Sequence, residues 1–138
     1  MYNKNVCSQK EYLDGKATED AIKPIIEKQL ECILNDTSKY SIFDFVGDNI
    51  FVEVKGRKIS SRKYNTTFIN YKKIEKSNTY NKDVSIYFFF KYTDCIKYIK
   101  YNKEIFDKFE IKKIYLKHRN CLLKNCLIPV NRLLDVDK

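Results

Sequence analysis

Two runs of alternating apolar and polar residues flank a turn signal in the first half of the chain. Residues 40–46 and 50–55 have the two-residue period of β-strands, and Gly47-Asp48 lies between them as a hairpin turn. If the chain turns there, Phe45 lies opposite Ile50, and one face carries only apolar side chains: Phe43, Phe45, Ile50, Val52 and Val54. The pattern predicts an antiparallel hairpin with this face on a hydrophobic core.

The opposite face of the same hairpin holds Asp44, Glu53 and Lys55, beside Ile42 and Phe51. Asp44 is then diagonal to Glu53, so the two carboxylates are within reach of a shared ion. Two carboxylates can hold hard divalent cations, and a nearby lysine can orient water or stabilise charge on a phosphate. The alternation therefore predicts a metal-dependent phosphodiesterase site. A solvated sheet face with a cross-strand ion pair is the alternative interpretation.

The acid-x-Lys spacing carries no weight by itself, because a chain with 18 acids and 23 lysines contains such pairs by chance. The spacing occurs three times, at Asp14/Lys16, Glu53/Lys55 and Glu110/Lys112. The second pair is set apart by its context. Only this pair lies on a strand whose other face is uniformly apolar, and it has a further acid, Asp44, beside it on the neighbouring strand.

Other periodicities predict the remaining elements. A helix is expected over residues 18–35, with apolar residues at Ile22, Ile25, Ile26, Leu30, Ile33 and Leu34, and residues 1–16 are expected to be partly ordered. A second hairpin is expected over 83–92 and 95–101, and its run Tyr87–Phe90 predicts a strand buried on both faces. We also expect a short helix near 68–76, a helical turn at 104–109, strands at 109–116 and 121–130, and a short terminal helix capped by Asn131.

This order of elements predicts one α/β (α+β) domain over residues 1–138, with a central mixed sheet flanked by helices. A helix bearing a Glu, then a hairpin with Asp44 and Glu53-x-Lys55, resembles the PD-(D/E)XK nuclease superfamily, which includes restriction endonucleases and phage-type resolvases. The resemblance implies a restriction-endonuclease-like fold. Phe43 stands where the family often has proline, which is one departure from its pattern.

Carried over by residue, the resemblance implies that Asp44 and Glu53 bind metal and that Lys55 is the catalytic lysine. The helix glutamate of the family corresponds best to Glu19, with Glu27 and Glu31 as alternatives. The implied activity is hydrolysis of DNA phosphodiester bonds by an endonuclease that uses Mg²⁺ or Mn²⁺. A domain this small cuts one strand at a time, so a homodimer is a candidate arrangement.

The net charge of +9, from 27 Lys+Arg against 18 Asp+Glu, favours a polyanionic partner. Candidate nucleic-acid-binding residues follow the Glu-x-Lys motif and are interleaved with aromatic residues: Arg57, Lys58, Arg62, Lys63, Lys72 and Lys73. A solvated basic loop is the alternative. Lys, Asn, Ile and Tyr are all A/T-coded, so codon usage typical of a phage, a large DNA virus or an A/T-rich microbe also explains part of the charge. A non-catalytic nucleic-acid-binding protein and an interaction protein remain alternatives to the nuclease.

The remaining composition argues against several classes of protein. One histidine disfavours Ser-His-Asp and Cys-His mechanisms, and three glycines leave no P-loop or dinucleotide loop. Five cysteines, an odd number, and no apolar leader or membrane-length apolar run predict an intracellular protein of the cytoplasm or nucleus, including a viral protein in its host, rather than a secreted one.

Overall fold

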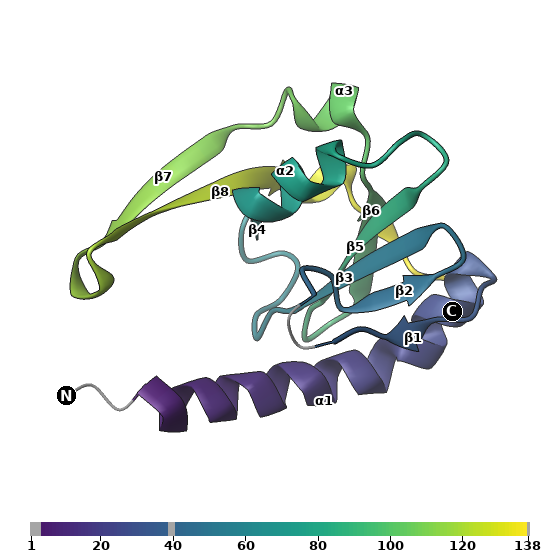
Figure 1. Ribbon diagram of the computed structural model, residues 1–138, viewed down its shortest axis with the longest axis horizontal. Helices are drawn as coiled ribbons and strands as arrows, with labels where there is room; N and C mark the ends of the chain where they lie inside the picture. Colours follow the sequence, from purple (N-terminus) through teal and green to yellow (C-terminus); the bar gives the residue numbers. More distant parts are fainter. Residues whose placement is uncertain (1–3, 39–40, 138) are drawn as a thin grey trace.

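The structure is a computed structural model that describes residues 4–38 and 41–137, with side chains described from residue 13 onward (Figure 1). Its larger sheet has six strands in the order β1 (Asn35–Asp36), β2 (Phe45–Gly47), β3 (Ile50–Gly56), β5 (Ser85–Lys91), β6 (Ile96–Lys100) and β9 (Leu134–Asp135). A smaller antiparallel sheet has the order β4 (Thr66–Asn70), β8 (Cys121–Pro129) and β7 (Ile111–Leu116). The helices are α1 (Lys4–Leu30), α2 (Tyr71–Asn78) and α3 (Lys103–Phe106), with 3₁₀ turns η1 (Lys117–Arg119) and η2 (Val130–Arg132).

The larger sheet is mixed, as expected for the predicted fold class. Strands β3 and β5 run parallel, and every other neighbouring pair in the sheet is antiparallel. A parallel pair needs a long crossover connection, which β4 and α2 provide here. The α/β prediction of a mixed sheet flanked by helices is confirmed. Among the described helices, none is long and apolar enough to cross a membrane.

Each face of the larger sheet is covered. On one face, α1 packs Ile22 and Ile26 against a cluster that includes Phe45, Val52 and Phe89. On the other face, the smaller sheet and α2 contribute to a second cluster with members Phe43, Ile69, Ile74, Phe88, Phe90 and Ile128. The predicted burial of β5 on both faces is confirmed, because Phe88, Phe89 and Phe90 are each fully buried.

The first hairpin is present, but its turn lies one residue further along than Gly47-Asp48. Gly47 pairs with Ile50, so Asp48 and Asn49 form the turn, and Asn49 has a left-handed φ of 56° that asparagine tolerates. Phe45 therefore lies opposite Val52 rather than Ile50. The register moves by two residues, which leaves the division of β3 between its two faces unchanged. Tyr40, the first residue of the predicted strand, lies outside the described residues.

Phe43 was assigned to the wrong face. It lies before β2 begins, packs in the cluster opposite α1, and has its ring centroid 5.3 Å from that of Phe51. Strand β2 begins only at Phe45, so strand alternation does not extend to Phe43, whose carbonyl oxygen accepts a hydrogen bond from Thr37 Oγ1 at 2.6 Å. Glu53 on this face is only 1% exposed, so for Glu53 the alternative of a solvated sheet face is wrong.

The two ends of the chain also differ from expectation. Helix α1 begins at Lys4, far ahead of the predicted residue 18, and ends at Leu30 rather than 35. The predicted terminal helix is wrong: one 3₁₀ turn at Val130–Arg132 is followed by β9, which pairs with β6. A Lys97–Asp135 ion pair of 2.7 Å joins these edge strands. The prediction also missed β4, whose Asn70 caps α2 by accepting from the backbone N–H of Lys72.

Candidate active site

Glu53 is a carboxylate placed inside the protein by β3. Its side chain is 1% exposed, and the backbone of β3 is held between β2 and β5. The neighbouring residues Val52 and Val54 point to the α1 face, so strand alternation sends Glu53 to the opposite face. A buried carboxylate is costly unless it is paired, so its surroundings decide its chemistry.

Asp44 is fixed beside Glu53 by an irregular end of the hairpin. Its Oδ2 accepts a hydrogen bond from the backbone N–H of Val54 at 2.7 Å, and its own N–H donates to the carbonyl of Val52 at 3.0 Å. The Thr37 hydroxyl is 3.1 Å from the carbonyl oxygen of Asp44. These contacts hold the carboxyl at the edge of the sheet, within hydrogen-bonding reach of Glu53.

Glu19 reaches the same point from α1. Its carboxyl is also within hydrogen-bonding reach of Asp44. Of the two alternatives, Glu27 accepts a hydrogen bond from the N–H of Leu34 at 2.8 Å, and Glu31 is exposed with a left-handed φ of 53°. The structure thus brings Glu19, Asp44 and Glu53 together, and we refer to these three residues as the carboxylate cluster.

The carboxylate cluster has unusual proton affinities. Burial raises the pKa of Glu53 to about 8, and hydrogen bonding and charge from Asp44 add to the rise, while Lys73 and Lys55 oppose it. Burial and the same Asp44 also raise the pKa of Glu19 to about 8. Two carboxyls that crowd a third hold protons at neutral pH, because the charged forms are desolvated and repel one another.

Two lysines flank Glu53. The Nζ of Lys55 lies 3.6 Å from Glu53 Oε2, and its side chain is 37% exposed. The Nζ of Lys73 lies only 2.7 Å from the same oxygen, with a side chain that is 19% exposed. Lys73 also donates to the carbonyl oxygen of Ile42, two residues before Asp44. It therefore links α2 to both the buried carboxylate and the loop that carries Asp44.

The donor set of the cluster suits a hard divalent cation. Three carboxyls from α1, the loop before β2, and β3 supply oxygen ligands, which Mg²⁺ and Mn²⁺ prefer. Among the residues that the structure describes, no three His, Cys, Asp or Glu side chains already stand in a metal-binding arrangement. Burial and the neighbouring Asp44 raise the pKa of Glu19 and Glu53, so a cation that binds there would replace protons on these carboxyls. The residues fit the ion in kind.

A comparison with protein families places this cluster in context. A family model described as "Phage putative PDDEXK endonuclease" matches residues 9–113, a span that contains the whole carboxylate cluster and both lysines. The chain belongs to this family. No curated protein and no solved structure matches the chain. The resemblance to the PD-(D/E)XK superfamily is confirmed, and the family description supports a phage among the sources that codon usage left open.

The six predicted nucleic-acid-binding residues of this chain differ from one another in their exposure to solvent. Lys58, Arg62, Lys63 and Lys72 are exposed. Arg57 is turned inward: it donates to the Phe68 carbonyl and to Thr67 Oγ1, and its guanidinium lies 4.4 Å from the centroid of the Phe68 ring. Lys73 faces Glu53 rather than open solvent. Their role in binding nucleic acid stays a prediction.

Lys73 is the site residue whose place the sequence reasoning missed. In α2, Lys73 shares a helix face with the buried Ser77, whose hydroxyl donates to the Lys73 carbonyl at 2.7 Å. Lys72 and Lys76 share the exposed face. Reading residues 73, 74 and 77 as the inward face of a helix would have separated Lys73 from its exposed neighbours.

Proposed function

We propose that the chain is a metal-dependent endonuclease that hydrolyses DNA phosphodiester bonds at the carboxylate cluster. Membership in a nuclease family supports the reaction class. The observation that carries the proposal is the convergence of Glu19, Asp44 and Glu53 from three separate elements, with Lys55 and Lys73 beside Glu53. Nothing in hydrophobic packing calls for three carboxyls in one partly buried place.

In this proposal Glu19, Asp44 and Glu53 hold Mg²⁺ or Mn²⁺. The bound ion would polarise the phosphate and lower the pKa of an attacking water. The half-exposed Lys55 binds a phosphate oxygen and stabilises the negative charge that develops as water adds to phosphorus and the ester oxygen leaves. Lys73 is a positioning residue, which holds Glu53 and the Ile42 carbonyl in place.

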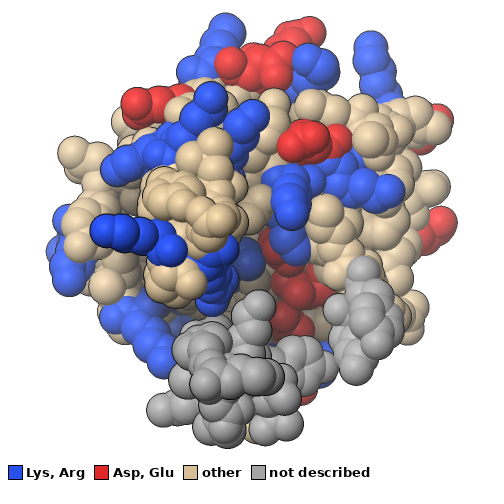
Figure 2. Space-filling model, turned by 60° about the vertical axis from the view of Figure 1, so that its left-hand side comes forward, with Lys and Arg blue, Asp and Glu red and all other residues tan. Residues whose placement is uncertain are grey.

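Basic side chains beside the cluster support a nucleic-acid substrate, since Lys55 and Lys73 both contact Glu53. Figure 2 shows acidic side chains set back among Lys and Arg on the end of the molecule toward which α1 begins. Recessed acids among basic side chains suit a phosphodiester chain, because Lys and Arg bind phosphates while the acids are available to a cation. DNA is our proposed substrate on the strength of the family resemblance.

The test compares two Glu-x-Lys pairs of the same chain. Glu53→Gln should lower Mg²⁺- or Mn²⁺-dependent cleavage of duplex, branched or single-stranded DNA at least about a thousandfold, since a metal ligand is lost. Glu110→Gln alters an exposed acid in an identical spacing and should leave cleavage unchanged. Retained DNA binding by Glu53→Gln would separate the nuclease from a non-catalytic binding protein. Full activity in Glu53→Gln, or no cleavage of any DNA by the wild type, would refute the proposal.

A further inference from the structure

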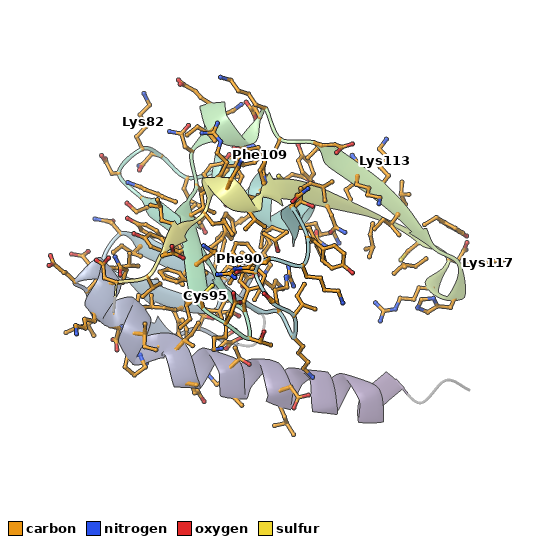
Figure 3. The ribbon with its side chains drawn as sticks, turned by 180° about the vertical axis from the view of Figure 1, so that it is seen from behind. Lys82, Phe90, Cys95, Phe109, Lys113 and Lys117 are labelled. Atoms are coloured by element: carbon orange, nitrogen blue, oxygen red, sulfur yellow. The ribbon has the colours of Figure 1, made fainter. Side chains whose placement is uncertain are left out.

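Strands β7 and β8 extend beyond the body of the protein as a two-stranded arm, which we define as residues 112–125. Strand β4 pairs with β8 only from Asn125 onward, so the pairs between Lys113–Lys124 and Leu116–Cys121 have no third strand. Figures 1 and 3 show the arm projecting from the body, with Lys113 along it and Lys117 at its tip. The family match ends at residue 113, near the start of the arm.

The arm holds charge of one sign. It contains Lys112, Lys113, Lys117, Arg119 and Lys124 and no Asp or Glu, so it carries +5 of the net charge of +9. All five of these residues are exposed. An arm that projects into solvent with one sign of charge creates a field suited to a polyanion.

The pairing within the arm adds a second observation. Lys113 lies directly opposite Lys124, and like charges opposite each other in a sheet are destabilising. Next along the same face, Tyr115 lies opposite Leu122, and the two side chains are 57% and 55% exposed. No carboxylate of the arm relieves the lysine pair, so an external anion is the group that would.

This face of the arm adjoins the active-site side of the molecule. The Nζ of Lys124 lies 5.6 Å from the ring centroid of Tyr71, the first residue of α2. The same helix carries Lys73 to Glu53. A ligand on this face would therefore lie next to the helix that carries Lys73 to the carboxylate cluster.

We infer that the arm binds the backbone of duplex DNA that flanks the scissile bond. The inference rests on the proposed function for the identity of the substrate and adds the element that holds it. A two-stranded β-ribbon fits the major groove of duplex DNA, and lysines along it contact phosphates. A second copy of the chain is a poor occupant, because it would set one +5 arm against another. Lys113, Lys117, Arg119 and Lys124 supply the contacts.

The test measures binding separately from cleavage. In a Glu53→Gln background, Lys113→Gln/Lys117→Gln should weaken binding to a duplex oligonucleotide by about tenfold or more near 0.1 M salt. The slope of log affinity against log salt should become shallower by about one for each phosphate that the variant no longer binds. Lys28→Gln/Lys82→Gln removes the same charge from exposed lysines away from the arm and should leave binding unchanged; Figure 3 shows Lys82 on the side opposite Lys117.

Three outcomes would overturn the inference. Equal losses in the two double variants would mean that only net charge matters. Unchanged duplex binding in the arm variant would mean that the arm does not touch DNA. Loss of binding to anionic lipid vesicles with duplex binding intact would assign the arm to a membrane surface. If the wild type binds DNA through the arm but cleaves none, the proposed nuclease function is wrong and the inference about the arm stands. If the wild type cleaves DNA and the arm variant binds it as well as before, the nuclease function stands and the inference about the arm is wrong.

Discussion

The carboxylate cluster and the arm each gather ionisable groups of one kind, but they do so in opposite surroundings. In the cluster, burial raises the pKa of Glu53 and Glu19 to about 8, and Lys73 forms a 2.7 Å ion pair with Glu53. In the arm, five cations stand in water with no acid among them. Buried charges are expensive and must be compensated within the protein, whereas exposed charges are screened and remain available to a partner.

Because of this difference, a lysine can contribute to stability or to binding, and a count of lysines does not distinguish the two. Lys73 and Lys113 each lie beside another charge, yet only Lys73 has a buried partner of opposite sign to lose. Substituting the first should change stability, and substituting the second should change binding. The difference between the two lysines can therefore be tested by experiment, and the largest change in stability is expected for a substitution of Lys73.

At about pH 9, where Glu53 is ionised, Lys73→Met should destabilise the protein by about 3 kcal/mol, because the buried carboxylate loses its cationic partner. The measurement is the free energy of unfolding by urea denaturation. Lys113→Met, which changes an exposed arm lysine to the same residue, should alter it by less than about 0.5 kcal/mol. Equal effects of the two variants would show that the surroundings of the two lysines do not differ in the way described.

Lys73→Met should also change the titration of the site. Lys73 lowers the pKa of Glu53, so its loss should raise that pKa further, as seen in the chemical shift of the labelled carboxyl carbon. A purely structural role for Lys73 would leave this titration unmoved in the folded variant.

The sequence predicted one side of the cluster well and the other poorly. Asp44, Glu53 and Lys55 are close in sequence and share a hairpin, so a two-residue period was enough to bring them together. Lys73 arrives through the crossover between β3 and β5, and no local pattern fixes where a helix in such a connection packs. Phe43 was misplaced because β2 begins only at Phe45, so the alternation that the sequence pattern assumed does not reach it.

The arm shows the same limit from the other direction. Both of its strands were predicted from their apolar runs, at 109–116 and 121–130. The projection of the two strands beyond the body was not predictable. It arises because β4, which pairs with β8, is only five residues long, and β4 was not predicted from the sequence. Lengths of neighbouring strands decide whether a hairpin is covered, and those lengths are set by distant segments.

A second, smaller effect should appear in the dependence of stability on pH. The folded-state pKa of Glu53 is about 8, above the ordinary value of 4.5, so the native state holds its proton more tightly than the unfolded state does. Stability in the presence of a chelator should therefore fall as pH rises from 4.5 to about 8. Glu53→Gln should flatten this fall by at least about 1.4 kcal/mol, the equivalent of one pKa unit.

The measurement for Glu53 is urea denaturation at several pH values with EDTA present. Glu110→Gln, an exposed acid, serves as the matched control and should keep the wild-type slope. A wild-type stability that rises between about pH 5 and 8 would contradict the assignment of a raised pKa to the cluster. Glu19 should contribute in the same direction, since its pKa is also about 8.

The smallest effect is expected at Asp94, which tests whether burial is the only route to a shifted pKa. Asp94 is exposed, yet hydrogen bonds from the N–H and hydroxyl of Ser61, at 2.8 and 2.7 Å, lower its pKa to about 2. The unfolded state binds the proton more tightly here, so this contribution is present above pH 3.8 and is lost as pH falls toward 2. Ser61→Ala should therefore lower the melting temperature slightly at about pH 6 and not at about pH 2. An equal decrease at both pH values would mean that the Ser61 hydroxyl acts through packing and not through the pKa of Asp94.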